Sequence, residues 1–290
     1  MHSALKPVKP GTAPSLTDAE ASPPTWVPGD DELSAATRAL LAHASTLQGM
    51  LFAERRRALV FVLQGRDASG KDGLLRKVFS ALHPQGVKAS TFGVPTPEEG
   101  AHDFLWRAHR ELPAFGQVGV WNRSHYEDIL VPRVHRTMPA RVWKSRYERI
   151  NAFEVEATAS GVHIVKLLIH ISRTEQLQRF QHRAADTSSQ WKLQPGDLRD
   201  RAQWPRFTRA YRDIIAQCNN RDAPWYVVPA DRKPVRDYLV ASLLVRHLEA
   251  LDPAPPSADP ALLAAVAALR CAERRDGTAG RAVGGVPCVA

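Results

Sequence analysis

The sequence contains little cysteine and no long apolar run. Its three cysteines, Cys218, Cys271 and Cys288, are scattered and follow neither a CxxC nor a zinc-ligand spacing. No apolar run reaches the roughly 18 residues of a membrane-spanning helix, and the N-terminus lacks the apolar region of a signal peptide. These absences argue against a disulfide framework and a membrane span, and they predict a soluble protein of the reducing cytoplasm.

Acidic residues are also in the minority. Lys and Arg number 39 against 30 Asp and Glu, which gives a formal net charge of +9 and a pI of about 9.8. This balance suits a polyanionic partner such as nucleic acid, an anionic membrane or a phosphate polymer. The alternative is a soluble protein that is basic without such a partner, and net charge alone does not separate the two.

The chain is long enough for one large α/β domain with additions at its ends. Residues 1–30 are rich in proline and small residues and show no periodicity, so we expect a disordered arm. Residues 253–290 begin with a Pro/Ala-rich stretch, and apart from one short helix at 261–270 we expect a flexible tail. The compact domain should therefore cover residues 32–252.

Short apolar runs alternate with helical patterns inside this domain. The strand-like runs are residues 59–63, 87–92, 118–121, 162–171 and 225–228. Strands that alternate with crossover helices form parallel sheets with helices on both faces. The sequence therefore predicts an α/β three-layer sandwich around a parallel five-stranded sheet.

A glycine-rich loop, residues 65–71, lies between the first strand and an amphipathic helix and ends in lysine. This is the setting of a phosphate-binding P-loop. Gly65 and Gly70 let the backbone curl so that successive N–H groups point inward, and Lys71 would reach a bridging or terminal phosphate. The alternative, a plain glycine turn without a ligand, does not account for the lysine at this position.

The loop departs from the usual P-loop pattern at its acidic residues. Asp72 stands where Ser or Thr usually supplies a hydroxyl to Mg²⁺, and Asp67 lies inside the loop. A carboxylate beside an anion site is unfavourable unless a cation is bound there. We therefore expect Asp67 to be a Mg²⁺ ligand, whereas Asp72 either assists it or favours the start of the helix.

Polar residues follow the third and fourth strands, where ligands bind in parallel sheets. Arg123 offers donors to phosphate oxygens, and Glu127 and Asp128 offer carboxylates to Mg²⁺. Arg179 and Arg183 share one helix face in a region, about 179–205, that we expect to be a helical lid over the phosphates. The alternatives are a polar helix start after the third strand and a solvated basic helix after the fourth.

Six short motifs occur in a recognisable order. They are GRDASGKDG at 65–73, HPQGV at 83–87, AHDFLWR at 101–107, NRSHYED at 122–128, WKL at 191–193 and WYVVPADRK at 225–233. Together they resemble the polyphosphate kinase 2 family over about residues 32–250. The resemblance implies a P-loop kinase fold close to thymidylate kinase, with a helical lid.

The resemblance also implies a function. The family moves a terminal phosphate between inorganic polyphosphate and nucleotides with Mg²⁺, and its members form homodimers or homotetramers. The partners would be polyphosphate and ADP or ATP, with neither nucleic acid nor membrane. Asp67, Lys71 and Arg123 match family positions, and Arg183 is the expected lid arginine, with Arg179 as the alternative. Asn122, where some members carry aspartate, resembles the subgroup that also phosphorylates AMP.

The expected site residues fall into three groups. The catalytic residues are Asp67, Lys71, Arg123, Arg183 and Arg179; the phosphate- or nucleotide-binding residues are Gly65, Ala68, Ser69, Gly70, Asp72, Gly73 and Asn122; and the metal ligands are Asp67, Glu127 and Asp128. Two other functions fit the same residues less well. One is an ATP-dependent nucleotide or small-molecule kinase of the same fold, and the other is a non-catalytic polyanion-binding protein.

Overall fold

The computed structural model describes residues 5–275 and divides the chain into two units, Met1–Ala254 and Pro255–Ala290. The second unit contains one helix, α11 (Pro260–Arg275), on which Leu262, Leu263 and Leu269 are exposed. The predicted helix at 261–270 is therefore present and extends further toward the C-terminus. Residues 276–290, where a flexible tail is expected, lie outside the described residues.

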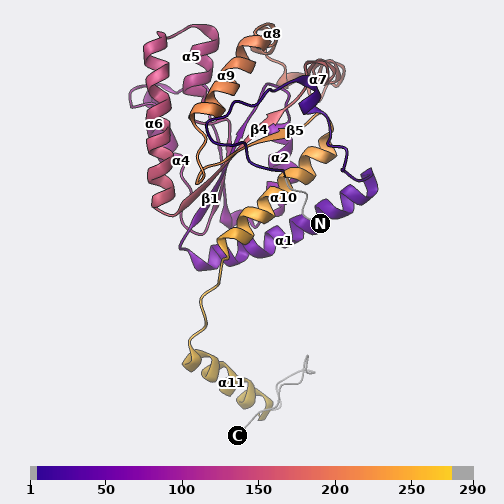
Figure 1. The fold of residues 1–290 in the computed structure, drawn as a ribbon. Helices are drawn as coiled ribbons and strands as arrows, with labels where there is room; N and C mark the ends of the chain where they lie inside the picture. Colours follow the sequence, from indigo (N-terminus) through magenta and orange to yellow (C-terminus); the bar gives the residue numbers. More distant parts are fainter. Residues whose placement is uncertain (1–4, 276–290) are drawn as a thin grey trace. The chain divides into compact units, whose positions relative to one another are not determined.

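The first unit is built on a five-stranded parallel sheet (Figure 1). The strands are β1 (Ala58–Gln64), β2 (Val87–Thr91), β3 (Val118–Asn122), β4 (Val162–His170) and β5 (Trp225–Pro229). Their order in the sheet is β2-β3-β1-β4-β5, and all four pairings are parallel. The predicted α/β fold with a parallel five-stranded sheet is confirmed.

Helices cover both faces of the sheet (Figure 1). On one face lie α1 (Asp30–Glu54), α2 (Lys71–Lys77) and α10 (Lys233–Leu251), and on the other lie α4 (Trp106–Glu111), α5 (Glu127–His135), α6 (Ala140–Ala159) and α9 (Trp204–Gln217). The side chains of β1 alternate between the two cores, because Phe61 and Leu63 face the α1 side whereas Val60 and Val62 face the α6 side. The short helix α3 (Pro97–Gly100) and the helices α7 (Arg173–Ala185) and α8 (Pro195–Ala202) complete the unit.

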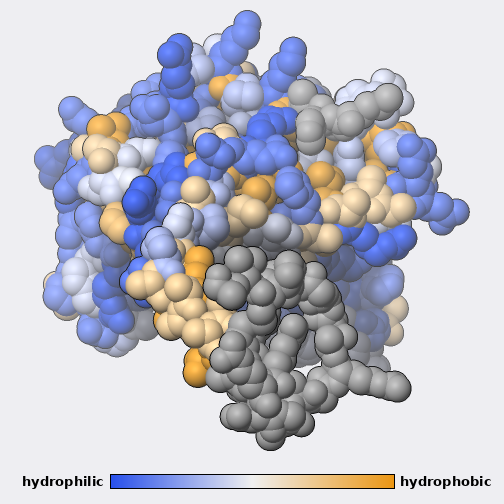
Figure 2. All heavy atoms as spheres, turned by 90° about the horizontal axis from the view of Figure 1, so that it is seen from below, coloured by the Kyte–Doolittle hydropathy of each residue, from blue (hydrophilic) through white to orange (hydrophobic). Residues whose placement is uncertain are grey.

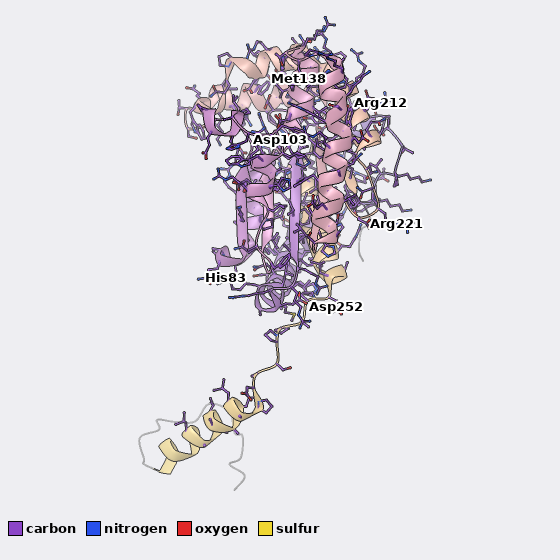
Figure 3. All side chains as sticks on the ribbon, turned by 90° about the vertical axis from the view of Figure 1, so that its left-hand side faces the viewer. His83, Asp103, Met138, Arg212, Arg221 and Asp252 are labelled. Atoms are coloured by element: carbon purple, nitrogen blue, oxygen red, sulfur yellow. The ribbon has the colours of Figure 1, made fainter. Side chains whose placement is uncertain are left out.

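The parallel register brings the carboxyl ends of the strands together. Leu63 of β1 lies opposite Asn122 of β3 and Leu167 of β4. His83 and Asp252 mark the amino-end side of the sheet in Figure 3, whereas Met138, in the turn between α5 and α6, lies at the opposite end. The loop that follows β1 and the turn that follows β3 therefore meet at the end where ligands bind in such folds.

The prediction that residues 1–30 form a disordered arm is wrong for the described part, residues 5–29. The Val8 amide donates to Trp225 O (2.8 Å), and Asn219 Nδ2 donates to Val8 O (2.7 Å), so the arm is hydrogen-bonded along β5, an edge strand. Leu16 and Ala21 are buried in the domain. One backbone hydrogen bond to the sheet edge, further hydrogen bonds to neighbouring segments and two buried apolar side chains hold a segment whose composition is typical of disorder.

No helix within residues 5–275 is long and apolar enough to cross a membrane. The face of the molecule in Figure 2 carries mainly hydrophilic side chains, with hydrophobic ones in small groups.

The packing of the arm predicts that Leu16→Ala lowers the free energy of unfolding by about 2 kcal/mol, because it removes a buried side chain and leaves a cavity. Denaturant unfolding would measure the loss, with Lys9→Ala, an exposed position in the same arm, as the control. Equal stability of the two variants would contradict the described packing.

Candidate active site

The loop between β1 and α2 has a backbone that only glycine permits at two positions. Gly70 adopts a φ of +104°, and a Cβ built there would lie 1.8 Å from Arg236 Nη1. A Cβ on Gly65 would lie 2.6 Å from the backbone oxygen of Ile169. Side chains at these positions would push the loop away from β4 and α10, so both glycines are needed for its close fit.

Lys71 is buried at the start of α2 and its ammonium group lies inside the loop. Nζ donates to Gly65 O at 2.7 Å and to Arg66 O at 3.1 Å. Burial, together with the nearby charge of Arg123, lowers the pKa of Lys71 to about 8 against the opposite effect of Asp67. The loop therefore holds a poorly solvated cation, which gains from a bound anion.

The end of β3 lies against this loop. Arg123 Nη2 donates to Asp67 Oδ1 at 2.8 Å, and Asn122 Nδ2 donates to Asp72 Oδ1 at 2.7 Å. The structure thus brings together five of the residues that the sequence singles out, from two segments about 50 residues apart. Arg123 has a φ of +61°, a strained conformation for a non-glycine residue.

Of the two carboxylates proposed after β3, only Glu127 reaches this cluster. Burial raises the pKa of Glu127 against the opposite effects of Arg123 and Lys71, and the charge of Asp67 raises it too. The Asp128 carboxylate is instead paired with Arg107 (Nη2 to Oδ2, 2.7 Å) and with Arg146. Neither Glu127 nor Asp128 lines the cleft at the loop. Consecutive residues of a helix point about 100° apart, so only one of the pair can face the loop.

The donor set fits a magnesium ion that also binds phosphate. Asp67 and Glu127 lie close enough for the charge of one to raise the pKa of the other, a repulsion that a divalent cation would relieve. Within residues 5–275 there is no group of three or more His, Cys, Asp or Glu side chains arranged to hold a metal ion. Mg²⁺ in kinases uses one or two carboxylates and completes its shell with water and substrate phosphates, so two carboxylates suffice.

A cleft of about 770 Å³ opens from the loop between α2, α7 and the start of α10. Its lining includes nine Lys and Arg residues against four Asp and Glu. Gly70, Lys71, Asp72, Gly73 and Asn122 lie on its floor with Asp67 and Ala68, whereas Gly65 and the fully buried Ser69 do not line it. The predicted lid corresponds to most of α7, a single 3₁₀ turn at Gln190–Lys192 and α8.

The two lid arginines occupy different environments. Arg179 lines the cleft but is buried, and its Nη1 donates to Ala68 O (2.9 Å) and Ser69 O (2.8 Å), so its donors are used to support the loop. Arg183, one turn further along α7, lines the cleft, and its charge acts on Asp197. Its guanidinium has no hydrogen bond within residues 5–275, which leaves its donors available for a ligand.

The sequence analysis missed two further arginines at the loop. Arg236 of α10 is 2% exposed, pairs with Asp237 and packs against Gly70. Arg66, inside the loop, stacks on Trp204 of α9 with its Cζ 3.7 Å from the ring centroid, and burial lowers its pKa to about 10. Arg66 could have been found from its position inside the glycine-rich motif at 65–73. Arg236 could have been found as a basic residue in the first turn of the helix that follows the fifth strand.

A buried polar network supports the turn after β3. Lys166 and Glu154 are ion-paired with no exposed surface, and Tyr126 Oη donates to Glu154 Oε1 at 2.6 Å. On the other side of the turn, Gln64 Nε2 donates to Ser124 Oγ at 3.0 Å. Together these contacts hold both ends of the segment that carries Arg123 and Glu127.

His125, in the same turn, is fully buried beside Trp121, and burial lowers its pKa. Its Nε2 lies 3.4 Å from Glu154 Oε1, so it adjoins the same buried network.

Comparisons with known proteins agree with this geometry. The family model "Polyphosphate kinase 2 (PPK2)" matches residues 28–255. The chain is 45% identical over 205 residues to the AMP/ADP-polyphosphate phosphotransferase of Meiothermus ruber, covering 71% of this chain and 77% of the relative. It is 36% identical over 236 residues to the ADP-polyphosphate phosphotransferase of Rhodopseudomonas palustris, covering 77% and 82%.

A solved structure is similar over most of the chain. The crystal structure of polyphosphate kinase 2 from Arthrobacter aurescens TC1 superposes with a TM-score of 0.82 at 39% identity, covering 85% of this chain and 89% of the other. The match of the family model includes the loop, the turn after β3, the lid and α10. The chain therefore belongs to the polyphosphate kinase 2 family.

Proposed function

We propose that the protein is a Mg²⁺-dependent phosphotransferase that moves a terminal phosphate between inorganic polyphosphate and nucleotides. With polyphosphate as the donor, it would convert ADP to ATP and also AMP to ADP. The observation that carries the proposal is the buried Lys71 at the base of a cleft whose cations outnumber its carboxylates nine to four. The names of the relatives support polyphosphate and ADP or AMP as substrates. We also propose that the protein is cytoplasmic and that it forms a homodimer or homotetramer.

The residues of the cleft suit in-line phosphoryl transfer. An acceptor phosphate oxygen attacks the terminal phosphorus of the polyphosphate, and the bond from that phosphorus to its bridging oxygen breaks. Lys71, Arg123 and Arg183 would neutralise the charge on the transferred group, which is the main catalytic contribution in such reactions. Bound Mg²⁺ supplies further charge neutralisation at the phosphate oxygens, and Asp67 and Glu127 would hold it.

The proposal is tested with purified protein, Mg²⁺ and polyphosphate, with AMP and ADP offered separately. We expect ADP and ATP from AMP, and ATP from ADP. Lys71→Ala should lower kcat by about a thousandfold or more with unchanged thermal unfolding, because it removes the buried cation of the loop. Turnover with ATP as the only donor would instead identify an ordinary kinase.

A second prediction concerns pH. Because the pKa of Lys71 is about 8, the free enzyme carries this charge below that pH and loses it above. Substrate phosphates complete their ionisation near pH 6–7, with a second pKa of about 6, so kcat/KM for polyphosphate should fall as pH rises through about 8. The measurement is a kcat/KM profile from pH 6 to 10, and a constant value up to pH 10 would show that the cation is not titrating.

A third prediction separates the lid arginines. Arg183→Ala should lower kcat by about a hundredfold without changing stability, because Arg183 faces the cleft and makes no hydrogen bond there. Arg179→Ala should lower both activity and the free energy of unfolding, the latter by about 2 kcal/mol, because two loop carbonyls lose their buried donor. Activity and thermal unfolding of both variants give the answer, and a destabilised Arg183→Ala variant would contradict the assignment.

A further inference from the structure

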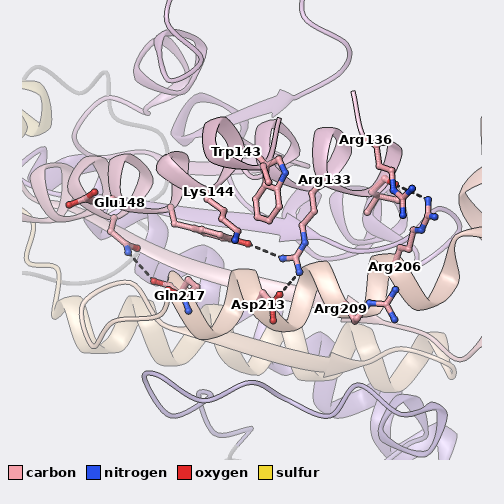
Figure 4. Close-up of a pocket in the computed structure, with 13 residues that line it drawn as sticks. Arg133, Arg136, Trp143, Lys144, Glu148, Arg206, Arg209, Asp213 and Gln217 are labelled. Atoms are coloured by element: carbon pink, nitrogen blue, oxygen red, sulfur yellow. Dashed lines mark hydrogen bonds and ion pairs between the residues drawn. The ribbon is translucent and has the colours of Figure 1, made fainter. Parts of the chain in front are cut away.

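A second concave surface lies outside the cleft. It is a groove of about 930 Å³ between α5, α6 and α9 (Figure 4). None of its lining residues lines the cleft at the P-loop. The groove is therefore a separate surface from the cleft in which the transfer is proposed to occur.

The groove gathers positive charge. Five Lys and Arg residues line it against two Asp and Glu. Arg133 is ion-paired with Asp213 and donates to Tyr147 Oη at 3.0 Å, whereas Arg136, Lys144 and Arg209 are exposed and have no carboxylate partner within residues 5–275. Cations held close together repel one another, and an anionic ligand removes that cost.

The shape of the groove favours an extended anion over a nucleotide. Trp143 has the Arg133 guanidinium 5.0 Å and the Lys144 ammonium 5.8 Å from its ring centroid, so cations occupy positions that a stacked base would need. Arg206 and Gln217 lie 11 residues apart on α9, about 16 Å along the helix at about 1.5 Å per residue. This length exceeds that of a single phosphate, and Arg136, Arg206 and Arg209 gather at one end of it (Figure 4).

The basic end of the groove lies close to the P-loop. On α9, Arg206 and Arg209 line the groove, whereas Trp204 and Thr208 contact Arg66 of the loop. Next to Arg136, His135 lies 3.1 Å from Asp200, whose pKa is raised by burial and by the charge of Asp67. Helix α9 thus contacts the P-loop through some of its residues and lines the groove with others.

We propose that this groove binds a segment of the polyphosphate chain outside the active cleft and so anchors long chains. The inference rests on the proposed function, because it assigns the same substrate to a second site. A chain of a few phosphates would fill only the cleft, whereas a long chain would also reach the groove. The groove should therefore affect the KM of long polyphosphate and leave that of short polyphosphate unchanged.

The test uses the triple variant Arg136→Gln/Lys144→Gln/Arg209→Gln of the full chain. We expect the KM for polyphosphate of about a hundred phosphates to rise about tenfold, with a weaker salt dependence, whereas kcat and the KM for tripolyphosphate stay within about twofold. The control variant Arg38→Gln/Arg56→Gln/Arg221→Gln removes the same charge from exposed positions outside the groove and should change neither KM. An equal rise with both chain lengths, or with the control, would overturn the proposal.

Two further measurements keep the outcomes distinct. Sedimentation of the groove variant detects a change in oligomeric state, which would identify the groove as a subunit interface and overturn the proposal.

Calorimetric titration with long polyphosphate measures binding without turnover. If the unaltered protein transfers no phosphate, the proposed function fails, yet a loss of binding in the groove variant alone would still support the groove. Binding equal to that of the unaltered protein would overturn it.

Discussion

The candidate site depends on one constraint, which is a lysine ammonium kept out of water inside a curled loop. The pKa of Lys71 falls from 10.5 to about 8, so its charged form is less favourable than in water by on the order of 3 kcal/mol. The carbonyl oxygens of Gly65 and Arg66 offset part of this cost. A phosphate chain would offset more, so the same burial that strains the free protein favours the binding of a polyanion.

Three buried or nearly buried arginines hold that loop from three helices. Arg179 of α7 binds its carbonyl oxygens, Arg236 of α10 packs against Gly70, and Arg66 of the loop stacks on α9. These contacts fix the loop backbone from outside, and a fixed backbone is the kind of preorganisation that electrostatic catalysis requires. Arg183 is different, since it lines the cleft without a hydrogen bond to the loop within residues 5–275.

The sequence predicted the fold well because its signals are local. The apolar run of β1, the glycines at 65 and 70, and the polar end of β3 each follow from residues adjacent in the chain. Arg236 could not be assigned in this way, since its contact with Gly70 links residues more than 160 positions apart. The sequence did not predict that residues 5–29 pack on the domain, because their partner is an edge strand more than 200 residues away in the chain. The different surroundings of Glu127 and Asp128 follow from helical geometry, because neighbours on a helix point about 100° apart.

The net charge leaves open whether this basic chain has a polyanionic partner, and the distribution of the charge favours such a partner. The cleft has an excess of five cations over carboxylates and the groove an excess of three, so the two surfaces account for eight charges, against a net charge of +9 for the whole chain. All other residues of the chain together therefore sum to a formal charge of +1. A protein that is basic without a polyanionic partner has no reason to gather its excess charge in two concave surfaces, whereas a protein that holds a long phosphate chain has one.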